Sequence, residues 1–505
     1  MQSPSSAGPT AGSTARPIDL ATAARQAVRK YGFLTDLPPD AAHQLATLGA
    51  STAASATAGT ATGRDLRSAL WSSIDDDHSR DLDQLEVADP SSENTAAGST
   101  RVRVAIADVD GLVPRGSPLD VFAGENATTV YTGVATFPML PELLSTDRTS
   151  LSQDSDRDAI IIEFVVASDG TIAQGDVYRG TVRNEAKLAY DSVGAWLSGT
   201  GAAPAVVAGN PGLAAQLRLQ SDVAKRLRQR RILRGALEFQ TIQATPVVVG
   251  GTVVDLRATN PGPARDLIEE FMVAANTTLA GYITSHQRSS IRRVVRTPVR
   301  WPRIVELAKG LGTALPAAPD GPALAAFLTA QQGADPAHFP DLSLAVIKLL
   351  GPGEYVVDTP GGPPTPHFGL AVDDYTHGTA PNRRYADLVT QRIVKAIIAN
   401  VAPPYTDAEL AAIATHCTTQ EDNARHAARL VSKQAAALML APHVGTVYDA
   451  VVTGVTDQGT YARLLAPPVE GRVTAGGQHL DVGDRIKAQL TATDPVRGFI
   501  DLHAQ

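Results

Sequence analysis

Hydrophobic and polar positions follow several different patterns along this chain, and each pattern predicts a different kind of element. Residues 18–30 and 41–48 carry apolar side chains at helical spacing. The residues before them, 1–16, are almost all Ser, Gly, Ala, Thr and Pro, which bury too little apolar surface to order a segment. We therefore predict a flexible tail over 1–16, and over 17–62 a small helical module, of the helix-turn-helix or winged-helix kind, with its linker.

The centre of the chain, residues 63–442, mixes the patterns of strands and helices. Short runs of apolar and β-branched residues predict strands, whereas longer runs with apolar residues three and four positions apart predict helices. The expected strands include 102–107 and 159–166, and the expected helices include 266–283, 384–400 and 406–440. Such a mixture predicts one large α+β domain.

The pattern changes again over residues 443–505. Short β-branched runs such as 449–455 alternate with turns of Gly, Asp and Pro. Closely spaced short strands are typical of a small β-barrel, and their order resembles that of the OB-fold barrels that close many RNA-processing enzymes. A barrel with a purely structural role stays open as an alternative, because OB surfaces are generic ligand platforms.

Composition and charge narrow the class of protein. The contents of hydrophobic residues (43%) and charged residues (19%) are those of a folded globular protein. The formal net charge of −8 argues against a loose, non-specific nucleic-acid binder, so an RNA path has to be a local basic strip. Basic residues cluster at 225–234 and at 288–303, and each cluster is equally typical of a solvated helix face.

Cysteine content and hydropathy indicate in which cellular compartment the protein is expected. The one cysteine, Cys417, excludes a framework of intramolecular disulfides and a multi-cysteine zinc site, and it fits a reducing compartment. No stretch approaches the roughly 18 apolar residues that suggest a membrane span. The first 17 residues contain no apolar signal-peptide core. We expect a cytoplasmic protein without a membrane partner.

The segment with the most distinctive chemistry is 73–84, with the sequence SIDDDHSRDLDQ. It gathers five aspartates within nine residues, and like charges at this spacing repel unless a cation lies between them. Magnesium in proteins typically binds one or two carboxylates together with phosphate oxygens. From the run alone, a solvated acidic turn and a calcium-binding loop stay open, although the spacing of an EF-hand loop is missing.

The same segment resembles the motif of the ribonuclease II/R (RNB) family, in which an Ile-Asp pair and five further residues precede Asp-x-Asp-Asp. Asp75, Asp81 and Asp83 fall on the first three family aspartates, and Gln84 falls on the fourth. The resemblance continues through 104–109 and covers most of the chain. It implies a Mg²⁺ site, with Mn²⁺ as a substitute, on the three aspartates, and a catalytic role for Asp81 and Asp83. Glutamine offers only a neutral carbonyl oxygen in place of the fourth carboxylate.

The resemblance also implies residues that hold RNA. Tyr131 stands seven residues before Pro-Met-Leu-Pro (138–141), as does the family tyrosine that stacks on the terminal base. Phe239 resembles the phenylalanine at the other end of the base stack, and Glu270 in the family's long helix is expected to border the RNA channel. An aromatic face holds any base without reading its edge. Core packing for the two aromatic residues, and a surface or capping role for Glu270, stay open.

A second motif lies at 375–387, YTHGTAPNRRYAD, which resembles the family pattern His-Phe-Thr-Ser-Pro-Ile-Arg-Arg-Tyr-x-Asp. Pro381 suits the start of a helix and would place Arg383 and Arg384 in the first turn, where anions bind readily. The resemblance gives both arginines the role of gripping the scissile phosphate and offsetting its charge. Gly378 and Asn382 replace residues that are usually apolar in the family.

Taken together, the resemblance implies a 3′-to-5′ exoribonuclease that acts as a monomer on single-stranded or 3′-overhang RNA and releases nucleoside 5′-monophosphates. The stretch before residue 63 is too short and too helical for the paired cold-shock barrels of many relatives. We hypothesise that the N-terminal module touches duplex RNA instead. An RNA-binding protein with impaired catalysis is the alternative, since Gln84 and Ala428 replace family acidic residues, and a DNA exonuclease also stays open.

Overall fold

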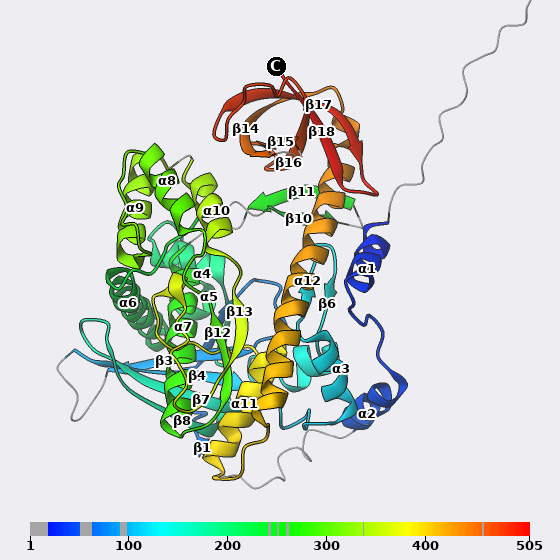
Figure 1. Ribbon diagram of the computed structural model, residues 1–505. Coiled ribbons are helices and arrows are strands. Elements are labelled where there is room, and N and C mark those ends of the chain that lie inside the picture. Colours follow the sequence, from blue (N-terminus) through cyan, green and yellow to red (C-terminus); the bar gives the residue numbers. More distant parts are fainter. Residues whose placement is uncertain are drawn as a thin grey trace, which may run out of the picture.

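The computed structural model describes residues 19–50, 63–90, 98–240, 244–249, 252–258, 262–336, 338–456 and 459–505. The predicted flexible tail (1–16) and most of the linker lie outside these residues. The described chain has a body built on a β-sheet, a long helix that leaves this body, and a barrel at the far end of that helix (Figure 1). No helix of the described residues has the length and apolar content needed to cross a membrane.

A seven-stranded mixed sheet forms the base of the body. The predicted strands at 102–107 and 159–166 are confirmed as β4 and β7, which pair antiparallel in the middle of the sheet. In spatial order the strands are β1 (Arg64–Asp65), β8 (Ile172–Arg183), β7 (Asp156–Val166), β4 (Thr100–Ala107), β3 (Gln84–Pro90), β2 (Ser72–Asp75) and β9 (Ala186–Ala189).

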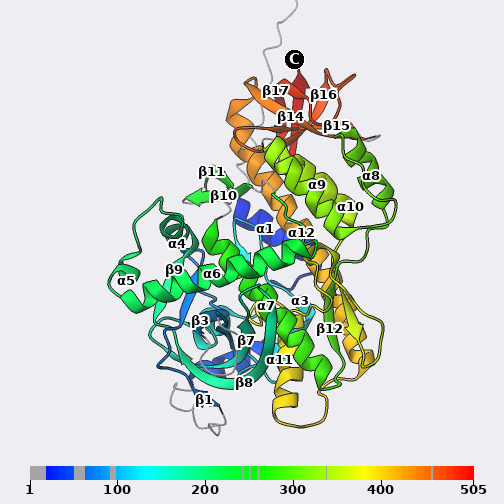
Figure 2. The same ribbon diagram turned by 90° about the vertical axis from the view of Figure 1, so that its left-hand side faces the viewer.

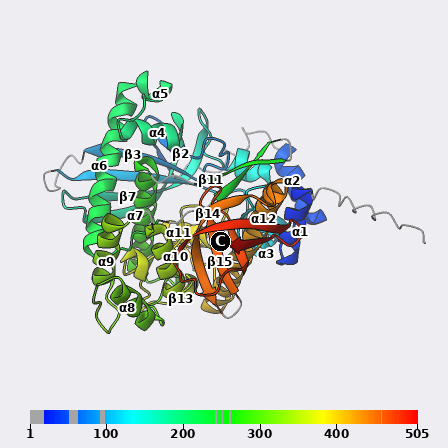
Figure 3. The same cartoon turned by 90° about the horizontal axis from the view of Figure 1, so that it is seen from above.

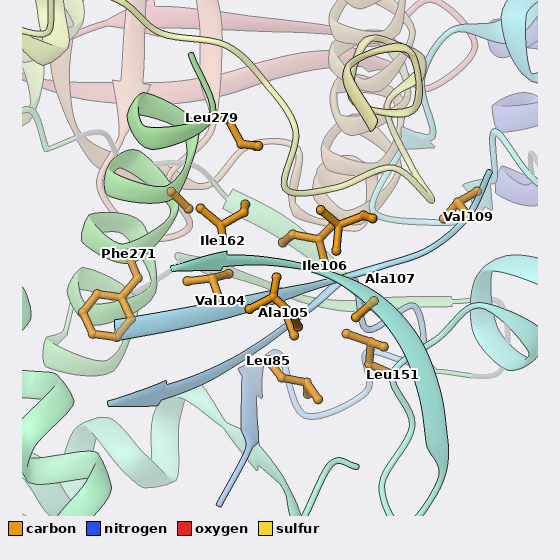
Figure 4. Close-up of a cluster of buried hydrophobic side chains, with 14 of the residues drawn as sticks. Leu85, Val104, Ala105, Ile106, Ala107, Val109, Leu151, Ile162, Phe271 and Leu279 are labelled. Carbon is orange, nitrogen blue, oxygen red and sulfur yellow. The ribbon is translucent and has the colours of Figure 1, made fainter. Parts of the chain in front are cut away.

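Helices cover the sheet and bury its apolar side chains. The predicted helices at 266–283 and 384–400 are confirmed as α7 and α11, and α6 packs against α7 and β3. Figure 4 shows how the side chains of the central strands meet Phe271 and Leu279 of α7 in the main core. The helices of this layer are α4 (Tyr190–Leu197), α5 (Ala205–Ala208), α6 (Pro211–Leu233), α7 (Pro263–Ser285) and α11 (Tyr385–Ile398).

Shorter elements connect this body to the rest of the molecule. The hairpin β5–β6 is important for the site, because Tyr131 ends its first strand. These elements are α3 (Pro118–Asn126), β5 (Val130–Tyr131), β6 (Thr136–Phe137), the π-helix η2 (Leu143–Arg148), β10 (Ala244–Val249), β11 (Thr252–Ala258), β12 (Ser290–Val294), β13 (Glu354–Asp358) and the 3₁₀-helix η3 (Phe368–Leu370).

The long helix α12 (Asp407–Leu440) joins the body to the barrel (Figure 1). It begins with a capping box, in which Thr406 and Glu409 bond each other's backbone N–H groups. After the 3₁₀-helix η4 (Ala441–His443), the predicted barrel is confirmed as a closed five-stranded one in the order β14-β15-β16-β18-β17. Its strands are β14 (Val447–Thr456), β15 (Gly459–Leu464), β16 (Glu470–Ala475), β17 (Arg485–Asp494) and β18 (Phe499–Ala504).

Three further helices form a small unit with its own apolar core, around Trp301 and Phe327. They are α8 (Trp301–Gly310), α9 (Gly321–Ala334) and α10 (Phe339–Leu350). Figure 2 shows this unit standing beside α12 and just below the barrel. One ion pair crosses from the unit to the barrel, between Asp341 and Arg463, at 2.7 Å.

The predicted N-terminal helices are confirmed as α1 (Leu20–Lys30) and α2 (Pro39–Ala50). They pack on different parts of the body, α1 along α12 and α2 against α3 (Figure 3). Ala24 and Ala27 of α1 lie against Val431 of α12, and Leu20 joins the core that the barrel shares with the end of α12. The first helix therefore braces the junction between the body and the barrel.

Candidate active site

The acidic motif lies in the connection between β2 and β3, and its side chains meet residues from distant parts of the chain. The hydroxyl of Tyr131 donates a hydrogen bond to Asp81 Oδ2 at 3.1 Å. The residue Tyr131 is 48% exposed, so its ring is open to a ligand while its hydroxyl is held. Burial of the hydroxyl and the charge of Asp81 raise the pKa of Tyr131, which keeps the phenol protonated as the donor.

Asp83 is the most enclosed of the predicted catalytic residues, at 2% exposure. Its Oδ1 accepts a hydrogen bond from the backbone N–H of Asn382 at 3.0 Å, and Arg383 Nε lies 3.5 Å from Oδ2. Burial raises the pKa of Asp83 to about 7, with the charge of Asp81 adding to the effect, although Arg383 and the Asn382 N–H oppose it. The structure thus joins Asp83 of the acidic motif to the arginine motif.

The two arginines of that motif have different surroundings. Helix α11 begins at Tyr385, so Arg383 and Arg384 precede the helix, and the prediction that they lie in its first turn is wrong. Arg383 is partly exposed beside Asp83, whereas Arg384 makes two hydrogen bonds to the buried carboxylate of Asp387, at 2.7 and 2.8 Å. Asp387 also accepts a bond from the Ala380 N–H and so anchors the turn from within.

Asp75 ends strand β2 and is partly buried. Its Oδ1 accepts hydrogen bonds from the Asp76 N–H at 2.8 Å and from the Ser79 hydroxyl at 2.9 Å. Burial raises the pKa of Asp75, and the charges of Asp81 and Asp76 add to the shift. The neighbouring Asp76 faces outward to Arg265, 2.7 Å away.

The donor atoms of this region suit a divalent cation only with ligands from outside the chain. Within the described residues, no three His, Cys, Asp or Glu side chains are gathered so as to hold a metal by themselves. Magnesium usually keeps several waters and binds one or two carboxylates together with substrate phosphates. Asp83 Oδ2 is buried and makes no hydrogen bond. A site of one or two carboxylates that substrate and water complete therefore fits these residues.

A carboxylate that the sequence motif does not include lies close to this region. Glu86, two residues after Gln84 on β3, is fully buried at 0% exposure. Burial raises the pKa of Glu86 well above its ordinary value, and the charge of Asp75 adds to the shift. The signal available in the sequence was the polar alternation Gln-Leu-Glu ahead of the apolar Val87 and Ala88.

The other two residues expected to contact RNA already contact protein groups. Phe239 packs against the core of the α8–α10 unit, beside residues such as Trp301. Glu270 is 3% exposed and forms a paired interaction with Arg231 of α6, at 2.8 Å to Arg231 Nε. Their predicted roles in binding RNA stay predictions.

The two basic clusters hold the fold together rather than forming a free strip. In the first, Arg226 bonds Thr100 and the Ala167 carbonyl, and Arg228 pairs with Glu238. In the second, the fully buried Arg292 pairs with Asp358 at 2.9 Å, and Arg293 with Glu421 at 2.6 Å. Arg292 and Arg293 are buried in strand β12, so neither an RNA strip nor a solvated helix face describes them.

Cations that the sequence analysis did not single out line a cavity of about 830 Å³. This cavity lies between the β5–β6 hairpin, α12 and the barrel, and Tyr131 forms part of its wall. Its basic residues are Arg425, Arg429, Lys433 and Arg463. Ala428, which stands where the family has an acidic residue, is on the same wall. The signal in the sequence was the recurrence of basic residues along one face of the long helix.

Comparisons with known proteins show which families the body and the barrel resemble. The family model described as "RNB domain" matches residues 63–400, and "RNase II-type exonuclease C-terminal S1 domain" matches residues 446–505. Ribonuclease R 1 of Lactococcus lactis is 29% identical over 440 residues, which are 84% of this chain and 52% of that protein. The chain spans between half and two thirds of the length of the first curated relatives that it matches.

Solved structures share the fold. Mycoplasma genitalium RNase R in complex with ribose-methylated single-stranded RNA has a TM-score of 0.85 at 21% identity, covering 96% of this chain and 78% of that one. Yeast Ssd1, a pseudonuclease, has a TM-score of 0.68 at 18% identity, covering 96% of this chain and 58% of that one. At these identities the likeness concerns the fold.

Proposed function

The chain belongs to the RNB family, and from this premise we propose that it is a 3′-to-5′ exoribonuclease that hydrolyses RNA to nucleoside 5′-monophosphates with Mg²⁺. The observation that carries the proposal is the bond from Tyr131 to Asp81. It joins a cation-lined cavity of about 830 Å³ to the acidic motif. An RNA end that stacks on the Tyr131 ring would present its last phosphate to Asp81 and Asp83.

Each residue of the site has a separate role in this proposal. Asp83, buried beside Arg383, accepts the proton of the attacking water and directs the guanidinium toward the phosphate. Arg383 offsets the negative charge that develops on the scissile group. One or two of the carboxylates Asp75, Asp81 and Asp83, together with water and substrate phosphate, would hold a divalent cation, which would supply Lewis-acid activation of the phosphate. Arg384 keeps the turn in shape through Asp387.

The first test follows the length of the substrate. A 5′-labelled single-stranded RNA is incubated with Mg²⁺ and either the native chain or Asp83→Asn, which keeps the size of the side chain and removes its charge. We expect a descending ladder from the native protein and a loss of roughly a hundredfold or more in the variant. Asp158→Asn, an exposed carboxylate of β7, is the matched control and should shorten RNA at the native rate. A native chain that binds RNA without shortening it would contradict the proposal.

That outcome would favour the second candidate, an RNA-binding protein on the RNB fold without nuclease activity. Gln84 and Ala428 support it, because each is neutral where the family is acidic. The fold itself is compatible with both candidates, since a pseudonuclease shares it. A labelled single-stranded DNA in the same assay separates a ribonuclease from a DNA exonuclease, because DNA lacks the 2′-hydroxyl that distinguishes RNA.

The setting of the activity is part of the same proposal. We propose that the chain acts as a monomer in the cytoplasm on RNA with a single-stranded 3′ end. Cys417 is the one cysteine and is buried, which is compatible with a reducing compartment. A 3′ overhang of increasing length on a labelled duplex would measure how far single-stranded RNA must enter the cavity before decay begins.

A further inference from the structure

The barrel presents a carboxylate to the cavity that the basic residues line. Along β15, Ala462 and Leu464 are buried in the barrel core, so Arg463 between them points outward. Glu470 of β16 lies directly opposite Arg463 and shares that outer face. Both residues line the cavity, and Glu470 is the one carboxylate among the described residues of its wall. A wall that otherwise suits phosphate therefore carries one group that repels it.

Glu470 lacks the ionic partner that its position offers. Opposite charges directly across an antiparallel pair of strands normally attract each other. Here Arg463 instead reaches α10, where its two terminal nitrogens contact the two Asp341 oxygens at 2.7 and 3.1 Å. Within the described chain, the Glu470 carboxylate forms no ion pair. Its negative charge is therefore not neutralised by a side chain.

A hydroxyl group from the next strand holds the carboxylate. The pairing of β14 with β15 is irregular between Val452 and Gly454, so Thr453 is an extra residue there, and such a bulge re-aims a side chain. The Thr453 hydroxyl donates a hydrogen bond to Glu470 Oε2 at 3.0 Å, and Thr453 lines the same cavity. No described residue donates a hydrogen bond to Glu470 Oε1. That oxygen stays available to accept one from a ligand.

The carboxylate and the cations of this cavity favour different parts of a nucleic-acid strand. Arg429 and Lys433 of α12 attract phosphates without regard to sequence. A carboxylate repels phosphates and binds hydrogen-bond donors, which on a single strand are base N–H groups and the ribose 2′-hydroxyl. A glutamate that accepts from the N4 amino group of cytosine is a typical contact of this kind. Phosphates that follow the cations would leave base or ribose edges to face Glu470.

We propose that Glu470 is a specificity-determining residue, whose carboxylate accepts a hydrogen bond from the bound strand. The donor is the exocyclic amino group of a base or a ribose 2′-hydroxyl. The inference rests on the proposed function for the presence of RNA in the cavity. Strands that can donate at this place then bind more tightly than strands that cannot, although their phosphate contacts are the same.

The test compares three labelled strands of equal length, oligo(rC), oligo(rU) and oligo(dC), by fluorescence anisotropy with Mg²⁺ omitted. Both bases are pyrimidines, but uracil has a carbonyl oxygen in place of the cytosine amino group, and oligo(dC) lacks the 2′-hydroxyl. We expect the native chain to bind oligo(rC) about three- to tenfold more tightly than the strand that lacks the donor.

In Glu470→Ala this preference should disappear, and the strand without the donor should bind more tightly because a repulsive charge is gone. A loss of the preference for oligo(rC) over oligo(rU) identifies the base amino group as the donor. A loss of the preference for oligo(rC) over oligo(dC) identifies the 2′-hydroxyl. Asp481→Ala is the matched control, because it removes an exposed carboxylate of the barrel that does not line the cavity, and it should keep both preferences.

Equal changes in all three affinities would overturn the proposal, because a purely repulsive charge or a loosened barrel acts on every strand alike. The inference and the proposed function can fail separately. A chain that loses its preference in Glu470→Ala and yet leaves RNA intact would retain this inference and lose the proposed function. A chain that shortens RNA, with the same preferences in the native protein and in Glu470→Ala, would retain the function and lose this inference.

Discussion

Arg383 and Arg384 are adjacent in the sequence, yet substitutions at them should have opposite consequences. Arg384→Gln removes the partner of Asp387, a carboxylate with a fully buried side chain, so the free energy of unfolding should fall by about 3–5 kcal/mol. Arg383→Gln should change it much less, because Arg383 is 42% exposed and 3.5 Å from Asp83. Its turnover of RNA should instead drop roughly 10²- to 10³-fold.

Urea unfolding and single-turnover decay of a labelled RNA measure the two quantities separately. Arg383→Lys is the control for charge, since lysine keeps the positive charge and loses the planar, two-pronged donor. If Arg384→Gln unfolds at the native urea concentration but no longer shortens RNA, the phosphate contact belongs to Arg384 and our division of roles is wrong.

His367 should make the folded state sensitive to acid. Its Nδ1 accepts a bond from the Leu370 N–H at 3.2 Å, and burial, with Arg293 and Arg231 nearby, lowers the pKa of His367 from 6.5 to about 4. Between these values the unfolded chain binds a proton that the folded chain does not. The stabilisation is therefore complete above about pH 6.5 and is lost as the pH falls toward about 4.

His367→Asn should flatten this dependence, because asparagine keeps an oxygen for the Leu370 N–H and does not titrate. The free energy of unfolding in urea is measured at pH 7 and at pH 5 for the native chain and for His367→Asn. The change between the two pH values gives one slope for each protein. His78→Asn is the control, because the His78 side chain is 99% exposed. Equal slopes in the native chain and His367→Asn would show that His367 is protonated in the folded state as readily as in the unfolded one.

Single residues also show where sequence reasoning reached its limit. The resemblance implied that Asp81, Asp83 and Arg383 serve one site, and Arg383 does lie 3.5 Å from Asp83, although the spacing within either motif could not show a contact between the two. It gave no information on Gly378, where a Cβ atom would lie 2.5 Å from Leu279 of α7. The sequence motif also could not show that the Glu270 carboxylate is already paired with Arg231, because the two residues are 39 positions apart.

At the scale of elements, helix α1 supports the hairpin that carries Tyr131. Val28 is fully buried in a cluster with Val130 of β5 and Ala427 of α12. Val28→Asp would place a charge in that cluster, so α1 should detach and the hairpin should loosen. We expect faster hydrogen exchange over 20–30 and 129–137 and weaker binding of single-stranded RNA.

Val121→Asp is the matched control, since Val121 is 65% exposed on α3 and should tolerate the charge. Hydrogen-exchange mass spectrometry reports both segments in one experiment. If hydrogen exchange in Val28→Asp becomes faster in α1 alone, and the hairpin and the RNA affinity do not change, then α1 covers α12 without supporting Tyr131. In that case contact with duplex RNA, hypothesised from the sequence, would be the remaining role for the N-terminal helices.

The elements that the sequence predicted best are those with a strong internal period or cap. Helix α12 was expected over 406–440 and is observed at Asp407–Leu440, because the Thr406 capping box fixes its start. The start of α11 was misjudged because Pro381 opens a turn, which Asp387 holds, rather than the helix. Helices α8 to α10 were not predicted individually, since their short amphipathic runs depend on one another for burial.

At the scale of the whole molecule, a negative net charge is combined with a local group of cations in one cavity. The chain carries a net charge of −8, and many of its arginines pair with carboxylates inside the fold. The cavity between the body and the barrel collects basic side chains from α12 and β15. Binding of RNA should therefore depend on a small set of residues, of which Arg463 also joins the barrel to α10.

Arg463 and its partner Asp341 allow the binding role to be separated from the structural one. Both side chains are almost buried, at 11% and 12% exposure, and they lie 2.7 Å apart. Arg463→Gln removes a cation from the cavity, so single-stranded RNA should bind several-fold more weakly. The slope of the logarithm of the binding constant against the logarithm of salt concentration should become shallower by about 0.7. Asp341→Asn releases Arg463 from its partner, so the affinity should stay the same or increase and the salt dependence should steepen.

Fluorescence anisotropy of a labelled RNA over a series of salt concentrations, with Mg²⁺ omitted, measures both quantities. If the ion pair served only to hold the barrel against α10, the two substitutions would break the same contact and weaken binding equally, without a change in salt dependence. Opposite signs are the result expected if Arg463 divides its contacts between Asp341 and the phosphates of RNA. That competition would make the closure of the barrel over the cavity depend on whether RNA is bound.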